Sequence, residues 1–392
     1  MQPTDATPAE SASAAGRPTL AGTFVALGDL HLDTPFAWAP ASVGRLRRND
    51  LRDALEASVA LCETAGADAL LLAGDIYEHD RITPDTARFI TRVLNRCSCR
   101  VLVAPGNHDW LSPSSVWATA DFDDHVHVFD GRSLEPVRIA GVTVWGAAHH
   151  SPSGTPGFLD DFRVRGEGPH LGLFHGSEKA GFSIEDRDQS GRSKQPHAPF
   201  EASQIPRSGL AHAVVGHFHR RREATHHTYP GNPAPLAFGE QGGGGAVVLG
   251  VTPAGAVERA WHSVSARSMH DVEIDVTGCF DASAIRDEVA SKTAGLSGLV
   301  RLSLTGEIDQ SIELVDDDVA AAVSPTIDHV VVRRTKLSQA LDFTTLQAEA
   351  SVRGQFVRSV LYDQRLDEQT RFAVLATGLR ALDGRRDLDV SR

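Results

Sequence analysis

The 392-residue sequence predicts an α/β fold followed by a smaller second region, and three observations lead to this prediction. Between Thr23 and Thr252, short apolar runs rich in Val and Leu alternate with helical patterns, as buried strands and their connecting helices do. Several of these runs are followed at once by clusters of Gly, Asp, His and Asn. After Pro253 the pattern changes, and two long helical segments appear. We therefore expect an α/β region that carries the chemistry and a separate C-terminal region.

The expected strands of the first region are short and bounded by Gly or polar residues. They are Phe24–Leu27, Ala69–Ala73, Val101–Ala104, Val142–Gly146, Leu171–Phe174, Ala213–Val215 and Ala246–Val251. Helical patterns are expected over Asp50–Ala65 and Pro84–Arg96. The stretch Gly176–Pro199 is polar and contains Gly, Ser and Pro, which predicts a long loop.

In the C-terminal region we expect three strands, with a helix at Ala282–Ser291 between the first two. The strands are Val272–Val276, Val300–Leu304 and His329–Val332. Helical patterns follow at Phe343–Tyr362 and Glu368–Leu382. The last pattern has one apolar face, which predicts either docking of a partner or packing within the chain. That face contains Phe372, Leu375, Leu379 and Leu382.

The predicted division is a disordered tail over residues 1–22, a catalytic domain over 23–265 and a C-terminal domain over 266–392. The tail lacks the basic start and the apolar run of a signal peptide, and no apolar stretch is long enough to span a membrane. Cys97 and Cys99 form one close pair without a second pair to complete a zinc site. We therefore expect Cys62, Cys97, Cys99 and Cys279 to be reduced thiols of a cytoplasmic protein.

The net charge of −13 argues against a protein that holds nucleic acid on a broad basic surface. A polyanionic substrate would have to be attracted locally. Two basic runs are candidates for such contacts. One is Arg45, Arg47 and Arg48, expected in a single loop, and the other is Arg220, Arg221 and Arg222, interpreted as substrate-binding residues or as a solvated run.

Five polar clusters follow apolar runs in the first region, and we expect their side chains to meet. The carboxyl ends of neighbouring strands lie at one rim of an α/β sheet, where such proteins place their sites. In Asp-x-His and His-x-His, residues two apart in extended backbone point the same way. The candidate metal ligands are Asp29, His31, Asp75, Asn107, His175, His217 and His219.

This set of candidate ligands is too large for one ion, so the pattern predicts two. Asp, His and Asn suit Mn, Fe or Zn. Two carboxylates held together would repel each other, and a bridging position for Asp75 between two cations removes that cost. Two ions about 3.5–4 Å apart recur in phosphatases and nucleases. Each cluster alone is compatible with a turn or a core histidine, and their shared position after apolar runs favours the metal site. The other histidines, including His149 and His150, are interpreted as surface or core residues.

The order of these clusters resembles the motifs of the calcineurin-like metallophosphoesterase superfamily. The matching residues are Asp29-x-His31, Gly74-Asp75, Gly106-Asn107-His108-Asp109, His175 and Gly216-His217-x-His219. The resemblance implies a four-layer αββα sandwich, to which the C-terminal region would add an α+β capping domain and a helical tail. It implies one ion bound by Asp29, His31, Asp75 and His219, and another bound by Asp75, Asn107, His175 and His217. His108 would approach the scissile phosphate.

Within the superfamily, the sequence is similar to the SbcD-type DNA repair exonucleases, including the YhaO-like branch. The similar segments are Asp29–Phe36 and Tyr229–Pro233 with Pro235-Leu236, and more loosely the region from His270 with Arg353–Arg358. The resemblance implies a DNA exonuclease that uses manganese, with Fe, Zn or Mg as alternative ions. It also implies DNA repair in a homodimer with an SbcC-like coiled-coil ATPase.

The expected reaction is hydrolysis of a phosphodiester by a hydroxide that two metal ions activate. His108 would protonate or hydrogen-bond the leaving oxygen, and Asp109 would orient His108 or its loop. Two alternatives stay open: a phosphoesterase acting on small molecules such as cyclic nucleotides, and a non-catalytic scaffold on the same fold. A phosphoprotein phosphatase fits less well, because Asp109 stands where that family usually has Glu.

Overall fold

The computed structural model describes residues 19–181, 196–240, 245–309, 312–340 and 343–382, which group into two compact units. Unit 1 contains the segment ending at Pro35, Arg48–Ala234 and Gly242–Val264. Unit 2 contains Phe36–Arg47, Pro235–Gln241 and the chain from Ser265. The predicted linear division into 23–265 and 266–392 does not include this exchange of short segments, and it stays a prediction.

The first sheet of unit 1 places three predicted strands side by side in parallel. These are β1 (Gly22–Leu27), β2 (Ala69–Leu72) and β3 (Arg100–Val103), and β4 (Val126–Val128) continues the parallel order. On the other side of β1, β11 (Ala246–Val251) and β12 (Val257–His262) pair in antiparallel fashion. The carboxyl ends of β1, β2 and β3 therefore lie at one rim.

The second sheet of unit 1 has the strand order β5-β6-β7-β8-β10-β9. Its four inner strands are parallel, namely β6 (Val142–Gly146), β7 (His170–His175), β8 (His212–Gly216) and β10 (His227–Tyr229). The edge strands β5 (Glu135–Ile139) and β9 (Arg222–Glu223) are antiparallel to their neighbours. The strands β7 and β8, which precede two predicted histidine clusters, thus end side by side.

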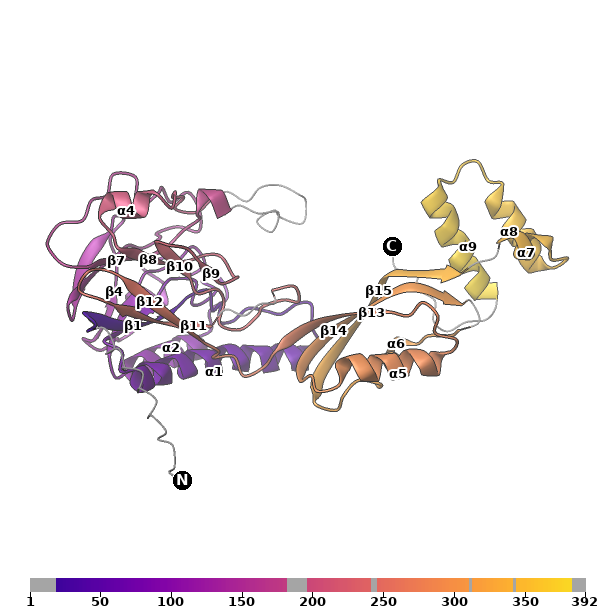
Figure 1. Ribbon diagram of the computed structural model, residues 1–392, viewed down its shortest axis with the longest axis horizontal. Coiled ribbons are helices and arrows are strands. Elements are labelled where there is room, and N and C mark those ends of the chain that lie inside the picture. Colours follow the sequence, from indigo (N-terminus) through magenta and orange to yellow (C-terminus); the bar gives the residue numbers. More distant parts are fainter. Residues whose placement is uncertain (1–18, 182–195, 241–244, 310–311, 341–342, 383–392) are drawn as a thin grey trace, which may run out of the picture. The chain divides into compact units, whose positions relative to one another are not determined.

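The two sheets face each other across a shared apolar core that includes the buried side chains of Phe24, Leu71, Val144 and Val214. The helices α1 (Ala41–Ala65) and α2 (Pro84–Asn95) lie outside the first sheet (Figure 1). The helix α4 (Gln204–Ser208) lies outside the second sheet, and Ile205 packs in a separate core cluster there. Two short elements complete the unit, α3 (Val116–Thr119) and a 3-10 turn (Lys179–Gly181). The predicted α/β fold is confirmed.

The helix α2 shows how local sequence fixes an element of unit 1. The Thr83 hydroxyl accepts a hydrogen bond from the Thr86 amide at 3.2 Å, and Pro84 opens the first turn, where it sacrifices no internal hydrogen bond. Apolar side chains at helical spacing, including Phe89 and Val93, are buried. The chain then returns through Cys97 and Cys99 into β3.

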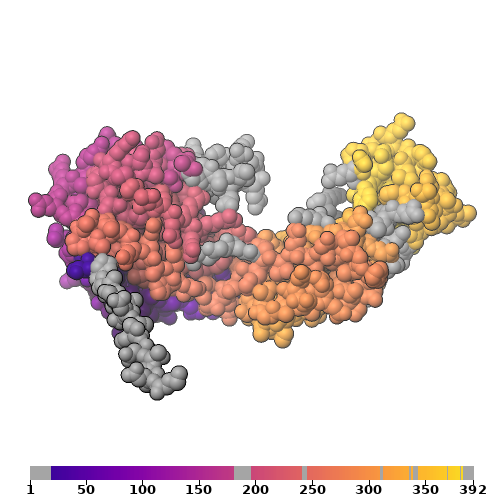
Figure 2. All heavy atoms as spheres, in the orientation of Figure 1, coloured from indigo at the N-terminus to yellow at the C-terminus, as the bar shows by residue number. Residues whose placement is uncertain are grey.

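Unit 2 is built on a parallel three-stranded sheet in the order β13-β14-β15. The strands are β13 (Met269–Asp275), β14 (Gly298–Asp309) and β15 (Ile327–Ala340), and the connecting helices are α5 (Ala282–Thr293) and α6 (Asp316–Ala320). Ile285 and Val289 of α5 are buried in one cluster with Val300, Leu302 and Leu304 of β14. In Figure 2, the surface of this C-terminal region is coloured orange to yellow because it comes from the last part of the chain.

Three helices follow the sheet of unit 2: α7 (Phe343–Ala348), α8 (Val352–Leu361) and α9 (Glu368–Leu382). The predicted apolar face of the last helix packs within the chain, because Leu375 and Leu379 are buried together with Leu346 and Val357. Only the end of that face is open, where Leu382 is 48% exposed. Among the described residues, no helix is both long and apolar enough to cross a membrane.

Several predicted boundaries differ from the structure. The helix expected from Asp50 already begins at Ala41, so Arg45, Arg47 and Arg48 lie on α1 and not in a loop. The helical pattern over Phe343–Tyr362 is two helices, since Ser351 caps α8 by accepting from the Gly354 amide at 3.1 Å. The predicted tail over residues 1–22 overlaps β1, which begins at Gly22, and its residues 1–18 lie outside the described residues. Of the loop predicted over Gly176–Pro199, residues 182–195 lie outside them as well.

Candidate metal centre

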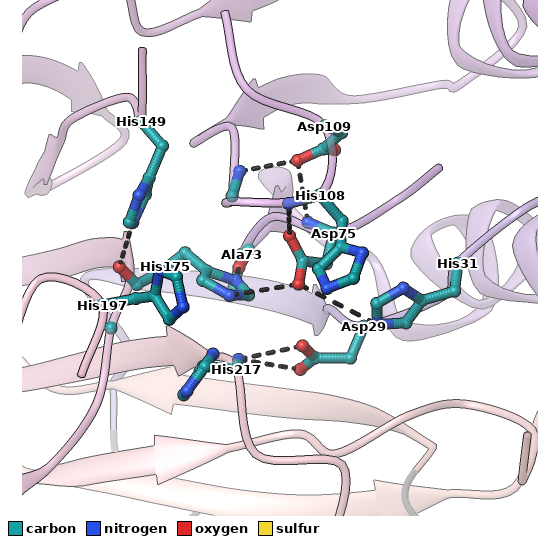
Figure 3. Close-up of polar contacts among 12 residues, drawn as sticks. Asp29, His31, Ala73, Asp75, His108, Asp109, His149, His175, His197 and His217 are labelled. Carbon is teal, nitrogen blue, oxygen red and sulfur yellow. Dashed lines mark hydrogen bonds and ion pairs between the residues drawn. The ribbon is translucent and has the colours of Figure 1, made fainter. Parts of the chain in front are cut away.

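The predicted clusters meet at the carboxyl-end rim of both sheets of unit 1. Beyond the strands, the chain after β1 stays paired with the chain after β2: the Asp29 amide donates to the Gly74 carbonyl at 3.0 Å, and the His31 amide to the Asp75 carbonyl at 2.9 Å. Figure 3 shows the side chains of Asp29, His31, Asp75 and His175 pointing toward one another. Backbone pairing therefore places two predicted ligands from one strand beside a third from its neighbour.

Four of the predicted ligands have backbone in the left-handed region, which non-glycine residues rarely adopt. The φ angles are 53° at Asp29, 52° at His31, 55° at Asp75 and 114° at His217. Such conformations cost of order 1–3 kcal/mol each and persist where surrounding contacts enforce them. Packing of an apolar core does not require left-handed backbone. Its concentration at one rim therefore indicates that these residues are held in position for a function.

Two glycines of the motifs allow the strands to approach closely at this rim. A Cβ on Gly106 would lie 2.2 Å from an Asp75 carboxylate oxygen and 2.9 Å from His175 Nδ1. A Cβ on Gly216 would lie 2.0 Å from the Ala73 carbonyl oxygen. Any side chain at either position would push two ligand-bearing segments apart.

One group of candidate ligand atoms comes from Asp29, His31 and His219, whose donor atoms all lie within 4.8 Å of one another. The His31 and His219 ring centroids are 5.0 Å apart. The Asp29 carboxylate also accepts the His217 amide at 2.9 and 3.1 Å, which ties the end of β1 to the end of β8. The structure thus brings together the side chains that the resemblance assigns to the first ion.

A second group comes from Asp29, Asp75 and His175, again within 4.8 Å. Asp75 Oδ2 is 3.2 Å from His175 Nε2 and 3.9 Å from His31 Nε2, so this carboxylate lies between the two groups. The ring of His217 is centred 5.2 Å from that of His175, and the buried Asn107 is adjacent in sequence to His108, whose amide donates to Asp75 Oδ1 at 2.8 Å. Asp29 is the residue that both groups contain, and the bridging role of Asp75 stays a prediction that its position between His31 and His175 supports.

Two histidines are oriented by contacts at Nδ1, so that their Nε2 atoms point toward the centre of the rim. His175 Nδ1 donates to the Ala73 carbonyl at 3.0 Å, and His31 Nδ1 lies 2.8 Å from Glu78 Oε1. Since neither a carbonyl nor a carboxylate can donate, each Nδ1 carries the proton. Such contacts orient metal-ligating histidines and fix their tautomer.

Glu78 is a site residue that the sequence analysis did not assign. Its second oxygen, Oε2, lies 3.0 Å from His108 Nδ1, so one carboxylate holds both His31 and His108. The two rings are 4.8 Å apart. Burial alone would raise the pKa of Glu78, but its contacts with His108 and His31 lower that pKa to about 2. The one signal in the sequence was its position three residues after Gly74-Asp75, at the same rim.

Asp109 does not touch the His108 side chain. Its buried carboxylate accepts three backbone amides, from Gly106 at 2.6 Å, Asp75 at 3.0 Å and Ile76 at 2.9 Å. The predicted catalytic role therefore narrows to the loop-orienting role, and Asp109 is a positioning residue. Burial and the charge of Asp75 raise the pKa of Asp109 to about 7, against the three amide donors.

Burial and neighbouring charged side chains shift the pKa values of the site residues. Burial raises the pKa of Asp29. For Asp75 burial acts in the same direction, but His175, His108 and His31 together hold its pKa well below the usual range. Conversely, burial lowers the pKa of His175 and of His108, and the carboxylates around them outweigh this and raise each pKa to about 9. The metal-free site therefore compensates its own carboxylate charge with protonated histidines.

The donor set fits divalent metal ions. Among the described residues, two buried atoms at this rim, His31 Nε2 and Asn107 Oδ1, lack a hydrogen-bond partner, and His175 Nε2 faces the Asp75 carboxylate at 3.2 Å. Leaving a buried polar atom unsatisfied costs about 1–3 kcal/mol, so the two at one rim favour a ligand there. Imidazole nitrogen and amide oxygen are donors that first-row divalent ions accept beside carboxylates.

The predicted basic residues differ in their surroundings. The Arg47 side chain is fully buried in unit 2 and donates to the Pro235 carbonyl at 2.7 Å, which excludes it from phosphate binding. The guanidinium of Arg222 lies 4.0 Å from the Phe218 ring centroid, and that of Arg221 lies 4.6 Å from the Trp261 ring centroid. Arg220 and Arg221 are exposed and directly follow His219.

Two excluded histidines also lie near the rim. His149 is fully buried and its Nε2 is 2.8 Å from the His175 carbonyl, so it is the core residue that was expected. His197 was not singled out, and its ring is centred 5.4 Å from that of His217. The positions of His149 and His197 near the rim follow from the folded structure and could not be predicted from their spacing in the sequence.

Asp, His and Asn side chains that converge at the rim of two facing sheets are typical of metal-dependent phosphoesterases. The family model of the calcineurin-like phosphoesterases matches residues 22–221, and the chain belongs to this family. The match covers every predicted metal ligand, from Asp29 to His219. Its members use divalent metal ions.

The proteins similar to this chain include a curated relative and a solved structure. An uncharacterized metallophosphoesterase, YhaO of Bacillus subtilis (strain 168), is 26% identical over 252 residues, which is 59% of this chain and 57% of the relative. The chain thus matches little more than half the length of that curated relative. The crystal structure of TT1561 of Thermus thermophilus matches with 16% identity and a TM-score of 0.35, covering 62% of this chain and 99% of that one.

Proposed function

We propose that unit 1 hydrolyses phosphodiester bonds with two divalent metal ions bound at its rim. The observation that carries this proposal is the convergence of Asp29, His31, Asp75, His175 and His219 at one rim, with the buried donor atoms His31 Nε2 and Asn107 Oδ1 left without a hydrogen-bond partner. Asp29, His31, Asp75 and His219 would hold one ion, and Asp75, Asn107, His175 and His217 the other. When bound, the ions supply an activated water and neutralise charge that develops on the phosphoryl oxygens.

His108 is the proposed general acid for the leaving oxygen. Its side chain is 45% exposed, whereas those of His31 and Asp75 are each 3% exposed, so it is the group of the rim that a substrate reaches first. Glu78 accepts from Nδ1, which leaves Nε2 directed away from Glu78 for the substrate. The carboxylates of Glu78 and Asp75 keep a proton on this ring at neutral pH by raising its pKa. A protonated imidazole beside the scissile bond can donate to the departing oxygen.

The proposed substrate is DNA, cleaved exonucleolytically with Mn²⁺ in cytoplasmic DNA repair. Support comes from the sequence resemblance to SbcD-type nucleases and from the exposed Arg220 and Arg221, which follow the His219 ligand and can contact a phosphate backbone. By the same resemblance, the proposed assembly is a homodimer with an SbcC-like ATPase.

A small-molecule phosphodiester is the second candidate substrate. The net charge of −13 favours it, because a long polyanion meets repulsion that a small diester largely avoids. Phosphate contacts by Arg220 and Arg221 would serve either substrate.

The test compares two substrates on one metal-stripped preparation. The protein is incubated with end-labelled duplex DNA and with bis-p-nitrophenyl phosphate, with and without Mn²⁺. Manganese-dependent shortening of the DNA supports the nuclease, and turnover of the diester with intact DNA supports the second candidate. The Asp75→Ala variant should be inactive on both, while Asp85→Ala, which changes an exposed carboxylate on α2, should match the wild type. No metal-dependent turnover of either substrate contradicts the proposal.

A further inference from the structure

Three cysteines of unit 1 lie together in the folded chain, away from the rim just described. The sulfur atoms of Cys62, Cys97 and Cys99 are all within 4.8 Å of one another. Cys62 comes from α1, and the other two come from the turn between α2 and β3. Sequence alone showed only the Cys97–Cys99 pair, because the third thiol is contributed by a distant helix.

The spacing of the three sulfurs suits one metal ion. Cys97 Sγ and Cys99 Sγ are 3.6 Å apart. Zn–S bonds of about 2.3 Å at a tetrahedral ion place neighbouring sulfurs ~3.8 Å apart. A disulfide would need two sulfurs at about 2.05 Å and would leave the third thiol without a role. Three converging sulfurs are therefore better explained by metal coordination than by a single disulfide.

The surroundings of the cluster allow an ion to enter and to be retained. Cys62 and Cys97 are 1% and 6% exposed, while Cys99 is partly exposed and opens toward solvent. A surface pocket of about 200 Å³ is lined by Ser98, which stands between the two cysteines, by Glu56 and Glu63 of α1, and by Arg96, whose guanidinium lies 3.4 Å from the Glu56 carboxylate. With two carboxylates and one guanidinium, the charged groups of the pocket have a net negative charge, which favours a cation.

We propose that Cys62, Cys97 and Cys99 bind one thiophilic d¹⁰ metal ion of the Zn²⁺ and Cd²⁺ class, with water completing the coordination beside Cys99. Each metal–sulfur bond replaces an S–H bond, and the proton goes to solvent. For Cys62, binding also breaks the present hydrogen bond from its thiol to the Ser58 carbonyl, at 3.4 Å. Soft thiolates select such ions over Mg²⁺ or Mn²⁺, which prefer oxygen.

A bound ion would join α1 to the segment that leads into β3. Cys99 directly precedes Arg100, the first residue of β3, and that strand ends just before Asn107 and His108. The ion would therefore brace the base of the strand whose other end carries site residues. The consequence is stability of unit 1, since a ligand that binds only the folded state raises the melting temperature.

The test is a Cd²⁺ titration of the reduced, full-length protein with Mn²⁺ in excess to occupy the rim. The rim contains no sulfur donor, so the ultraviolet thiolate-to-cadmium charge-transfer absorption reports on the cysteines alone. We expect saturation at one equivalent and protection of three of the four thiols from a thiol-titrating reagent. The melting temperature should rise with Cd²⁺ in the same range of concentration.

Matched variants separate the cluster from other thiols. Cys99→Ser changes the most accessible ligand and should lower Cd²⁺ affinity at least tenfold and reduce the absorption by about a third, in line with the loss of one of three sulfurs. Cys279→Ser, in unit 2, should leave both unchanged. Cys97→Ser repeats the test if the first variant folds poorly. Absence of the band in the wild type, an unchanged band in both cluster variants, or a disulfide among these cysteines in place of metal binding would overturn the proposal.

Discussion

The rim of unit 1 and the sheet of unit 2 differ in the kind of side chains that they bury. At the rim, buried Asp and His side chains are held by backbone hydrogen bonds, and three of them, Asp29, His31 and Asp75, have left-handed backbone. In the described part of unit 2 from Ser265 onward, Thr293 is the one buried polar side chain, and it bonds to the Val289 carbonyl at 2.8 Å. Among the described residues, every cluster of three candidate ligands lies in unit 1.

This contrast separates groups that serve chemistry from groups that serve packing. Buried ionisable groups and strained backbone lower stability, so their presence at one rim indicates that function maintains them. In the described part of unit 2 from Ser265 onward, the apolar core contains no buried charged side chain and no non-glycine residue with left-handed backbone. Substitutions at the rim should therefore act on metal binding and turnover, whereas substitutions in the core of unit 2 should act on stability.

The largest effect is expected for Asp75→Ala. It removes the carboxylate that lies between His31 and His175, and should abolish both metal binding and hydrolysis, with a loss above ~10⁴-fold, the upper end for a single acid–base group. The checks are metal content after dialysis and turnover of bis-p-nitrophenyl phosphate. Full metal content with normal turnover in Asp75→Ala would show that the rim residues do not act on metal binding and turnover as expected.

His108→Ala should retain its metal and lose turnover. Removing a general acid costs ~10²–10⁴-fold in kcat, and His108 is not a permanent ligand in the proposed assignment. Metal titration and steady-state kinetics on one preparation separate the two effects. Near-normal kcat would show that His108 is not the acid.

Glu78→Gln should give an intermediate effect, because Glu78 touches the substrate-facing His108 and the ligand His31 without being a ligand in the proposed site. Loss of such an orienting contact typically costs ~10–100-fold in metal affinity or activity. The pH profile of kcat should also shift, because the charge that raises the His108 pKa is removed. Glu258→Gln, at an exposed position of β12, is the matched control and should behave as the wild type.

Metal affinity should depend on pH with a definite sign. The carboxylates near His175 raise its pKa to about 9, so below that pH the metal-free ring carries a proton that must leave before Nε2 binds an ion. Affinity should therefore rise with pH up to about 9, by about tenfold per pH unit for each proton released. Calorimetry in buffers of different ionisation enthalpy measures this release. Binding without proton release at pH 7 would contradict it.

The smallest effect on turnover is expected for Leu302→Ala in the core of unit 2. The cavity should destabilise this unit by ~2–5 kcal/mol, while hydrolysis of the small diester stays unchanged. Glu307→Ala, at an exposed position on the same strand, should change neither. Chemical denaturation and the diester assay provide the two readings. A collapse of turnover in the folded Leu302 variant would show that the two regions are not separable in this way.

The sequence predicts the rim well because its residues occupy fixed places relative to strands. Clusters that follow neighbouring parallel strands meet at one edge of a sheet, so Asp29 and Asp75 could be brought together without coordinates. His175 ends β7 of the second sheet, and its place beside them depends on how the two sheets pack. The class of fold follows from the same alternation. The family match over residues 22–221 agrees with it.

Other features depend on contacts between distant segments and were not predictable. Glu78 has an ordinary place in the sequence, and only the folded chain shows it between His31 and His108. Arg47 looks like a surface charge, yet helix α1 begins early and buries it against the Pro235 carbonyl. The break within Phe343–Tyr362 depends on a single cap at Ser351, which a periodicity over the whole segment hides.

The most direct test of the central claim is the stoichiometry and coupling of Mn²⁺ at the rim. The metal-stripped protein is titrated with Mn²⁺ and followed by equilibrium dialysis and electron paramagnetic resonance. The account predicts two ions per chain with an exchange-coupled signal, since Asp75 lies between the two groups of donors, and loss of the coupling in Asp75→Ala. A single uncoupled ion in the wild type, or two ions that remain coupled without Asp75, would contradict it.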